Sequence, residues 1–296
     1  MKLLWYLIFR LFAGIFVVFP FWLLYLISDF FYYVVFYLIR YRKSVVINNL
    51  KKAFPEKSET EIRRTCKAYY RYLADIMVES LKGFTMSKES IIKRHKIVNP
   101  EILTTYYDQN RSVIGVSGHY GNWEWGTMSS GLQIKHKTIG FYQPLTNPFL
   151  DRFLKKTREK CETSLVSIKT TFETFQANSN KACAYLMLAD QSPTNLEKAF
   201  WIDFLGIDTA FLHGPEKYAR LYNLPVIYID IKPIRRGFYE LELIPLTENP
   251  NELKDGELTA LFAQTLEKRI IDNPKYWLWS HRRWKRSRTN SEQPVK

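Results

Sequence analysis

The first forty residues constrain the fold of this chain most, because they contain an apolar run that is too long for an ordinary surface helix. Residues 11–27 carry no charge, and a second apolar run covers residues 30–39. A helix that crosses a bilayer needs about 20 apolar residues, so the segment is long enough to span, with a kink expected at Pro20. A helix that lies in the membrane interface and a helix buried in a core are the two alternatives.

The flanks of this segment predict its topology. A cleaved signal peptide fits poorly, because the apolar part is too long and lacks a small-residue cleavage site. Cations directly after the segment favour the cytoplasmic side for the rest of the chain. We therefore expect an N-terminal hydrophobic membrane anchor at residues 1–42, a catalytic domain at residues 43–288 and a disordered tail at residues 289–296. The cations are Arg40, Arg42, Lys43, Lys51 and Lys52.

The chain is strongly basic and rich in aromatic residues. It has 43 Lys and Arg against 29 Asp and Glu, a formal net charge of +14, and 16% of its residues are aromatic. A basic surface favours a polyanionic neighbour, such as nucleic acid, an anionic membrane, or an acidic or phosphorylated ligand. Because Trp and Tyr concentrate at membrane interfaces, the aromatic content favours a membrane among these neighbours. Three scattered cysteines, Cys66, Cys161 and Cys183, are too few for a disulfide framework and favour a reducing compartment.

Strands that alternate with helices after the anchor predict an α/β fold, with a mixed central sheet flanked by helices. Within the helix expected at residues 58–83, Ser58 is the N-cap and Glu61 completes a capping box. Other helices are expected at residues 45–54, 149–160 and 256–271. Short apolar or alternating runs predict strands at residues 112–116, 181–190, 223–233 and 238–246.

The strongest chemical signal is the stretch SGHYGNWEW, which follows an apolar strand. Residues five apart on a continuous helix are rotated by about 140°, so His119 and Glu124 meet only if His119 lies in the turn before the helix. Two glycines supply that turn, and Asn122 is the expected N-cap and a candidate ligand contact. A carboxylate beside an imidazole raises its basicity, so that the other ring nitrogen can take a proton from a hydroxyl.

Other interpretations of this motif stay open from spacing alone. His119 and Glu124 can form a purely structural hydrogen bond. A metal site lacks the second histidine at helical spacing, since His136, His213 and His281 lie far along the chain. A cysteine nucleophile is disfavoured, because no cysteine lies in a recognisable elbow or beside a histidine.

Six blocks of sequence carry a family resemblance. In order they are YRKSVVINNLKKAFPEKSETEI, HYGNWEW, YQPLTNPFLDRFLKKTRE, LADQSP, DFLGIDTAFLHGPEKYAR and YWLWSHRRWKRSR. Together they resemble the lauroyl/myristoyl acyltransferases of lipid A biosynthesis, a branch of the lysophospholipid acyltransferase superfamily, over nearly the whole chain. HYGNWEW is similar to the family's H-x4-[DE] motif, and the ordered set is far more specific than that motif alone.

The resemblance implies an O-acyltransferase at the bacterial inner membrane, with its catalytic domain on the cytoplasmic side. It would move a fatty acyl chain from an acyl carrier protein thioester to a hydroxyl of a glycolipid, the lipid A precursor of lipopolysaccharide. His119 would be the general base and Glu124 would orient its ring. No cofactor is implied, because a thioester is already activated.

Further site residues are implied by the matched blocks. Arg158 is expected to contact a phosphate or the oxyanion, with a solvated helix face as the alternative. Asp190 ends a strand, a position typical of α/β active sites, with a turn or helix cap as the alternative. Gln191, beside it, and Asn122 are expected at the substrate. One departure is Gln143, which stands where the family often has arginine, so a contact to acceptor or carrier is missing there.

Two other functions remain as alternatives. The same chemistry can act on another acceptor, such as a lysophospholipid, an amino-acid lipid or another glycolipid. A non-enzymatic protein that binds membrane or nucleic acid is the second, although no nucleic-acid partner is expected. The aromatic and cationic residues 277–286 fit either a place at the bilayer or substrate, or a helix that buries tryptophan on one face.

Overall fold

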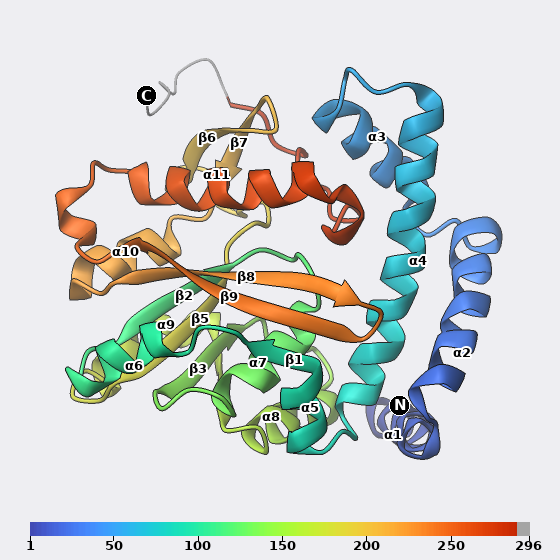
Figure 1. Cartoon of the computed structure of the whole chain (residues 1–296), viewed down its shortest axis with the longest axis horizontal. Helices are drawn as coiled ribbons and strands as arrows, with labels where there is room; N and C mark the ends of the chain where they lie inside the picture. The colour runs from blue at the N-terminus through green and yellow to red at the C-terminus, as the bar shows by residue number, and fades with distance from the viewer. Residues whose placement is uncertain (289–296) are drawn as a thin grey trace.

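A seven-stranded sheet forms the centre of the computed structural model, which describes residues 1–288 (Figure 1). The strand order is β1-β9-β8-β2-β5-β3-β4, and all neighbours are parallel except the antiparallel pair β8 and β9. The predicted α/β fold with a mixed central sheet is therefore confirmed. The strands are β1 (His95–Ile97), β2 (Val113–Ser117), β3 (Lys137–Tyr142), β4 (Thr163–Ser167), β5 (Cys183–Leu188), β8 (Val226–Arg235) and β9 (Phe238–Thr247). A separate antiparallel hairpin joins β6 (Phe200–Phe204) and β7 (Ile207–Phe211).

Helices cover both faces of the sheet and one of its ends (Figure 1). Those after the N-terminal pair are α3 (Lys43–Ala53), α4 (Glu59–Gly83), α5 (Lys88–Arg94), α6 (Glu101–Asp108), α7 (Trp123–Gly131), α8 (Pro148–Glu159), α9 (Thr171–Ala177), α10 (Gly214–Tyr222) and α11 (Glu257–Asp272). Short 3₁₀ helices lie at Ile168–Thr170, Pro250–Glu252 and Pro274–Tyr276. The predicted capping box forms at the start of α4, where Ser58 and Glu61 bond each other's backbone N–H.

The sheet separates two apolar cores. Successive side chains of a strand point to opposite faces. Ile114 and Val116 of β2 therefore join one core, with Leu266 of α11, while Val113 joins the other, with Trp125 of α7. Burial on both faces explains why β2 is apolar along its length, as is typical of a central parallel strand.

The N-terminal segment forms two helices, α1 (Lys2–Val18) and α2 (Phe21–Tyr33), and α2 continues as a π-helix at Val34–Leu38. The kink expected at Pro20 is a complete break, because Phe19 and Pro20 both take extended backbone angles. Residues Phe21–Leu38 are long and apolar enough to cross a membrane, by length and composition. The disordered tail that the sequence predicts, residues 289–296, lies outside the described residues.

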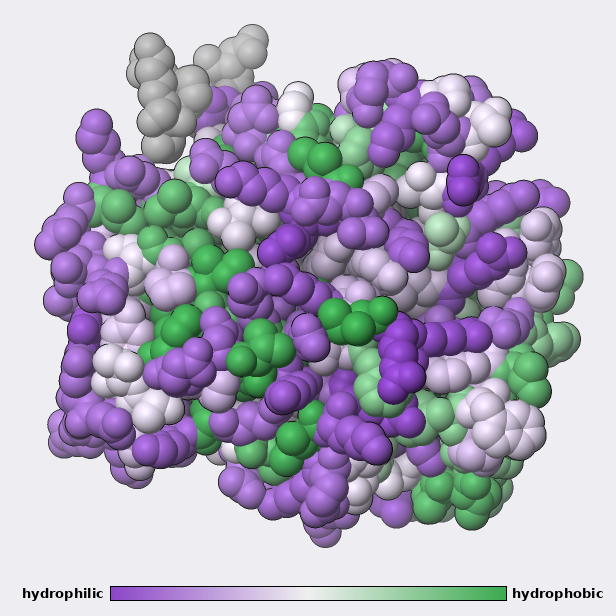
Figure 2. All heavy atoms as spheres, in the orientation of Figure 1, coloured by the Kyte–Doolittle hydropathy of each residue, from purple (hydrophilic) through white to green (hydrophobic). Residues whose placement is uncertain are grey.

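Apolar side chains of α1 and α2 face outward. Figure 2 shows them gathered at the lower right of the molecule, where Figure 1 places these two helices. Trp5 and Trp22 are each 65% exposed and Phe30 is 70% exposed. The opposite side of α2 packs against α4, with Leu24 and Ser28 buried. The segment is therefore not the buried core helix that the sequence left as one alternative.

Candidate active site

His119 and Asp190 leave the sheet side by side, because each follows the carboxyl end of one of two neighbouring parallel strands. In the pairing of β2 with β5, Ser117 lies opposite Leu188. The next residues of both strands turn away from the sheet together. The carboxyl ends of parallel strands are where α/β folds gather binding and catalytic groups.

The Asp190 carboxylate holds His119 by two hydrogen bonds. Nδ1 of the ring lies 2.6 Å from Oδ1, and the backbone N–H of His119 donates to Oδ2 at 2.8 Å. Oδ2 also accepts the indole N–H of Trp277 at 2.8 Å. With an ionised carboxylate as the acceptor, Nδ1 carries the ring proton and Nε2 keeps its lone pair.

Burial and charge act in opposite directions on this pair. Burial lowers the pKa of His119, but the charge and hydrogen bond of Asp190 and the charge of Glu124 outweigh it, so the pKa lies above the ordinary 6.5. Burial raises the pKa of Asp190, yet the interaction with His119 lowers it below the ordinary 3.8. Asp190 therefore stays ionised over the range in which His119 titrates, and the ring is a stronger base than a free imidazole.

Glu124 binds Arg158 rather than the His119 ring. In the first turn of α7, its Oε2 accepts a hydrogen bond from Nη2 of Arg158 at 2.9 Å. Arg158 of α8 is only 5% exposed, and its Nη1 is buried without a hydrogen-bond partner among residues 1–288. The sequence assigned the orienting contact to Glu124, whereas Nδ1 of the ring donates to Asp190. Glu124 acts on His119 through its charge, and it fixes a guanidinium whose Nη1 amino group is left to donate.

The second ring nitrogen of His119 faces Gln191. Nε2 of the Gln191 amide lies 3.1 Å from Nε2 of the ring. Because Nδ1 carries the proton, the amide is the donor. A hydroxyl that gives its proton to this ring nitrogen has to take the place of the amide, so Gln191 lies where a reacting group must enter.

Asn122 has a different environment from the one expected of a ligand contact. It is the N-cap of α7, as predicted, with Oδ1 accepting the backbone N–H of Trp125 at 3.0 Å. Its Nδ2 donates to Glu79 at 2.7 Å, and the residue is fully buried. Both polar atoms of the amide are thus engaged within the protein, which gives Asn122 a structural task.

An apolar cavity of about 60 Å³ lies between α7 and the sheet, next to this turn. Trp123 forms part of its wall and packs edge-on against the His119 ring, with 5.3 Å between centroids. Gly115 of β2 and Gly126 of α7 also line it and leave it open. A second apolar cavity, of about 20 Å³, shares part of this wall. Two larger surface pockets, of about 750 and 530 Å³, contain none of the residues at His119. The apolar space suits a hydrocarbon chain better than a polar ligand.

The C-terminal segment closes one side of the turn that carries His119. The backbone N–H of Leu278 donates to the carbonyl of His119 at 3.1 Å, and that of Gly121 donates to Tyr276 at 3.2 Å. After the 3₁₀ turn the chain is not helical, and Trp277 and Trp279 are both buried. The aromatic stretch that the sequence singled out therefore supports Asp190. The hydrogen bonds between this stretch and the SGHYGNWEW motif join distant parts of the chain, so no local sequence pattern predicts them.

The cysteines take no part in this arrangement. All three are buried free thiols, and burial raises the pKa of each, that of Cys66 to about 11. As for metals, within the described part of the chain no three His, Cys, Asp or Glu side chains come together in a way that could hold an ion.

Comparison with known proteins identifies the family. The model of the bacterial lipid A biosynthesis acyltransferases matches residues 2–286. The chain belongs to this family. It is 24% identical to a lipid A biosynthesis lauroyltransferase of Escherichia coli K12 over 249 residues, which cover 82% of this chain and 79% of the relative. A palmitoleoyltransferase of the same strain and a lipid A biosynthesis acyltransferase of Shigella flexneri are each 22% identical, over 83% of this chain and 80% of the relative. The resemblance seen in the sequence is confirmed, and this family member is an acyltransferase.

Proposed function

We propose that the protein transfers a fatty acyl chain from an acyl carrier protein thioester to a hydroxyl of a lipid A precursor. One observation carries the proposal: the His119–Asp190 pair directs the lone pair of Nε2 to the Gln191 amide, next to an apolar cavity that Trp123 lines. Family membership supports the reaction class. The names of the relatives, a lauroyltransferase and a palmitoleoyltransferase of lipid A biosynthesis, support the donor chain and the acceptor.

In the proposed reaction, the acceptor hydroxyl displaces the Gln191 amide and gives its proton to Nε2 of His119. The hydroxyl oxygen attacks the thioester carbonyl, and a tetrahedral intermediate with a negative oxygen forms. Nη1 of Arg158, buried and without a partner in the described structure, is the N–H donor that we assign to this oxygen. Collapse breaks the C–S bond, and the imidazolium returns its proton to the leaving thiolate. The products are an ester and a free thiol.

The charge of the chain supports the choice of partners. Acyl carrier protein is acidic and lipid A precursors carry phosphates, so a formal net charge of +14 attracts both, as well as an anionic membrane. Long-range attraction of this kind mainly accelerates encounter and weakens with salt.

We further propose that α1 and α2 lie in the cytoplasmic interface of the inner membrane. The outward side of both helices is apolar, with tryptophans at Trp5 and Trp22. The inward side of α2 carries polar groups, Tyr25, Ser28 and Asp29, that bind the catalytic part of the chain. A spanning helix would take these groups into hydrocarbon and away from their partners, at several kcal/mol each. An interfacial pair keeps all of these contacts.

The membrane proposal predicts the effect of charges on the outward face. The double substitution Trp22→Glu and Phe30→Glu removes two exposed aromatic groups, and we expect binding to anionic vesicles to weaken at least about tenfold. Cosedimentation with vesicles measures this. Phe172→Glu, at an exposed site on α9, is the control and should bind like the wild type. Unchanged binding of the double variant would contradict the assignment.

The proposed role of Glu124 gives a second prediction. Glu124→Gln removes the charge that fixes Arg158, and we expect kcat to fall about 10²-fold, since loss of one oxyanion donor costs about 10²–10³. Steady-state rates with saturating thioester and acceptor test this. Glu159→Gln, at the exposed end of α8, should leave the rate unchanged. A wild-type rate for Glu124→Gln would show that neither Glu124 nor its contact with Arg158 contributes to acyl transfer.

The proposed acyl site gives a third prediction. A methyl group at position 126 meets its nearest neighbours at 3.6 Å, an ordinary contact, so Gly126→Ala fits and serves as the control. Gly126→Leu fills the cavity, and we expect kcat/KM for a dodecanoyl donor to fall about 10–100-fold relative to a butanoyl donor. Competition between the two thioesters in one reaction measures this ratio. Equal loss for both donors would place the chain elsewhere.

The reaction itself is tested by acyl transfer with purified protein in detergent. Labelled acyl carrier protein thioesters are the donors, with a lipid A precursor, a lysophospholipid and an amino-acid lipid as separate acceptors. We expect label on the lipid A precursor. Label on another acceptor alone would keep the His119 chemistry and overturn the acceptor assignment. Absence of transfer to all three would overturn the proposed function.

A further inference from the structure

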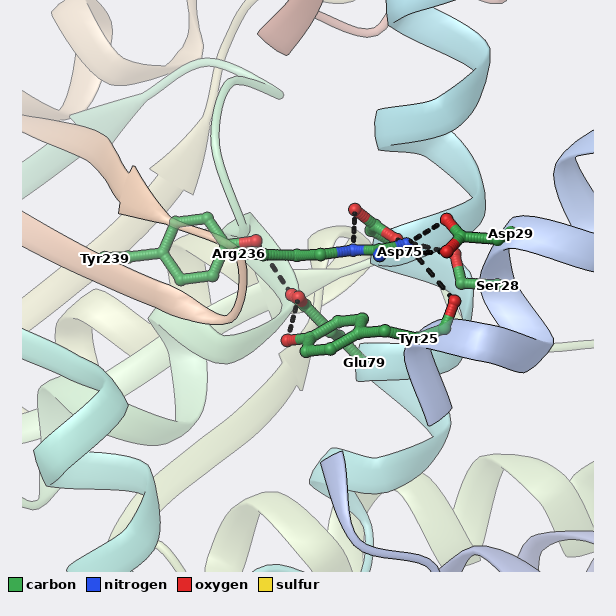
Figure 3. A network of polar contacts seen from close by, with 7 residues as sticks. All are labelled: Tyr25, Ser28, Asp29, Asp75, Glu79, Arg236 and Tyr239. Carbon is green, nitrogen blue, oxygen red and sulfur yellow. Dashed lines mark hydrogen bonds and ion pairs between the residues drawn. The ribbon is translucent and has the colours of Figure 1, made fainter. Parts of the chain in front are cut away.

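A buried carboxylate on α4 joins α2 to the turn at residues 118–122, which carries His119 and is called the catalytic turn here. Glu79 is 1% exposed, yet no cation lies within ion-pair distance of it in the part of the chain that the structure describes. Its carboxylate instead accepts three hydrogen bonds: from the hydroxyls of Tyr25 at 2.9 Å and Tyr239 at 2.8 Å, and from Nδ2 of Asn122 at 2.7 Å. Figure 3 shows the two tyrosines converging on it from α2 and β9. Three separate elements thus meet on one side chain of a fourth.

The Asn122 side of this cluster leads to the active site. Asn122 lies three residues after His119 and caps α7, which carries Glu124 in its first turn. The backbone carbonyl of Glu79 also accepts the indole N–H of Trp125 at 2.9 Å. Glu79 therefore fixes the first turn of α7 through both its side chain and its backbone, and with it the chain between the base and the Glu124 carboxylate.

The other side of the cluster fastens α2. One turn along α4 from Glu79, Asp75 accepts the hydroxyl of Ser28 at 2.6 Å and Nε of Arg236 at 2.9 Å. Arg236, at the tip of the β8–β9 hairpin, also binds Asp29 at 2.7 Å (Figure 3). The α2 helix runs antiparallel to α4 here, and it is held at two places along its length. Ser28 and Asp29 bind Asp75 and Arg236, and one turn earlier Tyr25 binds Glu79. Only the Tyr25 contact continues, through Glu79, to the catalytic turn.

We propose that Glu79 is a positioning residue that makes acyl transfer depend on the seating of α2. With α2 in place, the Tyr25 hydroxyl satisfies one carboxylate oxygen, and the other holds Asn122 and the cap of α7. When α2 is displaced, a buried carboxylate oxygen loses its donor, which is costly. Since burial already raises the pKa of Glu79 to about 7, the side chain then takes up a proton more readily. A protonated carboxyl is a weaker acceptor for the Asn122 amide, so the catalytic turn loosens.

The kinetic test of this inference rests on the proposed function. Its sharpest version exchanges the chemical groups of the two hydrogen-bonded residues, Glu79 and Asn122. In Glu79→Gln, when the introduced carbonyl oxygen takes the Oε1 position and accepts from Tyr25, the introduced NH₂ takes the Oε2 position and faces the NH₂ of Asn122. In Asn122→Asp, two carboxylates face each other. We expect either change to lower kcat about tenfold or more, as for a hydrogen bond to a charged group, with little change in KM.

The double variant, Glu79→Gln with Asn122→Asp, restores the contact with reversed polarity. The introduced glutamine amide donates to the introduced carboxylate, which still accepts the N–H of Trp125. We expect kcat to return to within about threefold of the wild type, because coupled neighbours deviate from additivity. Multiplied losses in the double variant would overturn the proposal.

The α2 link is tested by Tyr25→Phe, with Tyr72→Phe as the matched control. Tyr72 is also a buried tyrosine next to Glu79, but its hydroxyl has no hydrogen-bond partner among residues 1–288. We expect Tyr25→Phe to lower kcat about tenfold and to speed amide hydrogen exchange in residues 119–126, and Tyr72→Phe to do neither. Wild-type exchange in Tyr25→Phe would overturn the link. Exchange needs no turnover, so its outcome stays separate from a failure of the proposed reaction.

Discussion

Substitution of His119 by glutamine is expected to lower kcat for acyl transfer by about 10³–10⁴-fold, the upper range for loss of a general base. The glutamine carboxamide is too weak a base to take the acceptor proton, whereas the His119 pKa lies above 6.5. The backbone N–H at position 119 still donates to Asp190, so the turn keeps its shape. Initial rates with labelled thioester, at saturating acceptor, measure the loss.

Two controls accompany this variant. His213→Gln, at the start of α10 and outside the site, should retain wild-type activity. Circular dichroism and vesicle binding of His119→Gln should match the wild type, since the ring contacts Trp123, Asp190 and Gln191, none of which belongs to α1 or α2. A folded His119→Gln protein with an unchanged rate would show that another group removes the proton.

Asp190→Asn is expected to have the second-largest effect, a loss in kcat of about 10²–10⁴-fold, because it favours the wrong ring tautomer. Two donors, the His119 backbone N–H and the Trp277 indole N–H, converge on Oδ2. The asparagine carbonyl oxygen takes that place, and its NH₂ then faces Nδ1. Nδ1 must become an acceptor, the ring proton moves to Nε2, and the base loses its lone pair.

The pH profile separates this effect from misfolding. The base acts when neutral, so activity rises with pH through the His119 pKa, above 6.5 in the wild type. Loss of the Asp190 charge lowers that pKa, and we expect the acid limb of kcat/KM to move to lower pH in Asp190→Asn. An acid limb at the wild-type pH, with kcat reduced, would assign Asp190 to folding alone.

Local patterns predicted the elements that carry the site. An apolar run before two glycines predicted strand and turn at β2, and Asn122 was recognised as the helix cap from its residue type and place. The sequence did not predict which residues from distant parts of the chain contact His119. That Asp190 rather than Glu124 holds the ring depends on β5 lying next to β2, and strand order is set by packing of the whole sheet. Spacing within one motif contains no such information.

The sequence missed the strands β1, β3, β4, β6 and β7, and two of these have short or polar patterns. β4 reads TSLVS and β1 has three residues, and each pairs with one neighbour at an edge of the sheet. Their pairing is imposed by the strands beside them. In the anchor, Ser28 and Asp29 stood out as a polar break in an apolar run. Their partners, Asp75 for Ser28 and Arg236 for Asp29, lie 47 and 207 residues away along the chain, so no local pattern points to them.

The tip of the β8–β9 hairpin also limits how this chain can be altered. Exposed hairpin tips usually accept insertions, tags and grafted loops. Here Gly237 has a φ of +72°, and any side chain at that position would collide with the hydroxyl of Tyr25. An epitope inserted at this turn would therefore push on α2 and, through it, on the catalytic turn, whereas the exposed Gly206 turn of the β6–β7 hairpin has open space around it.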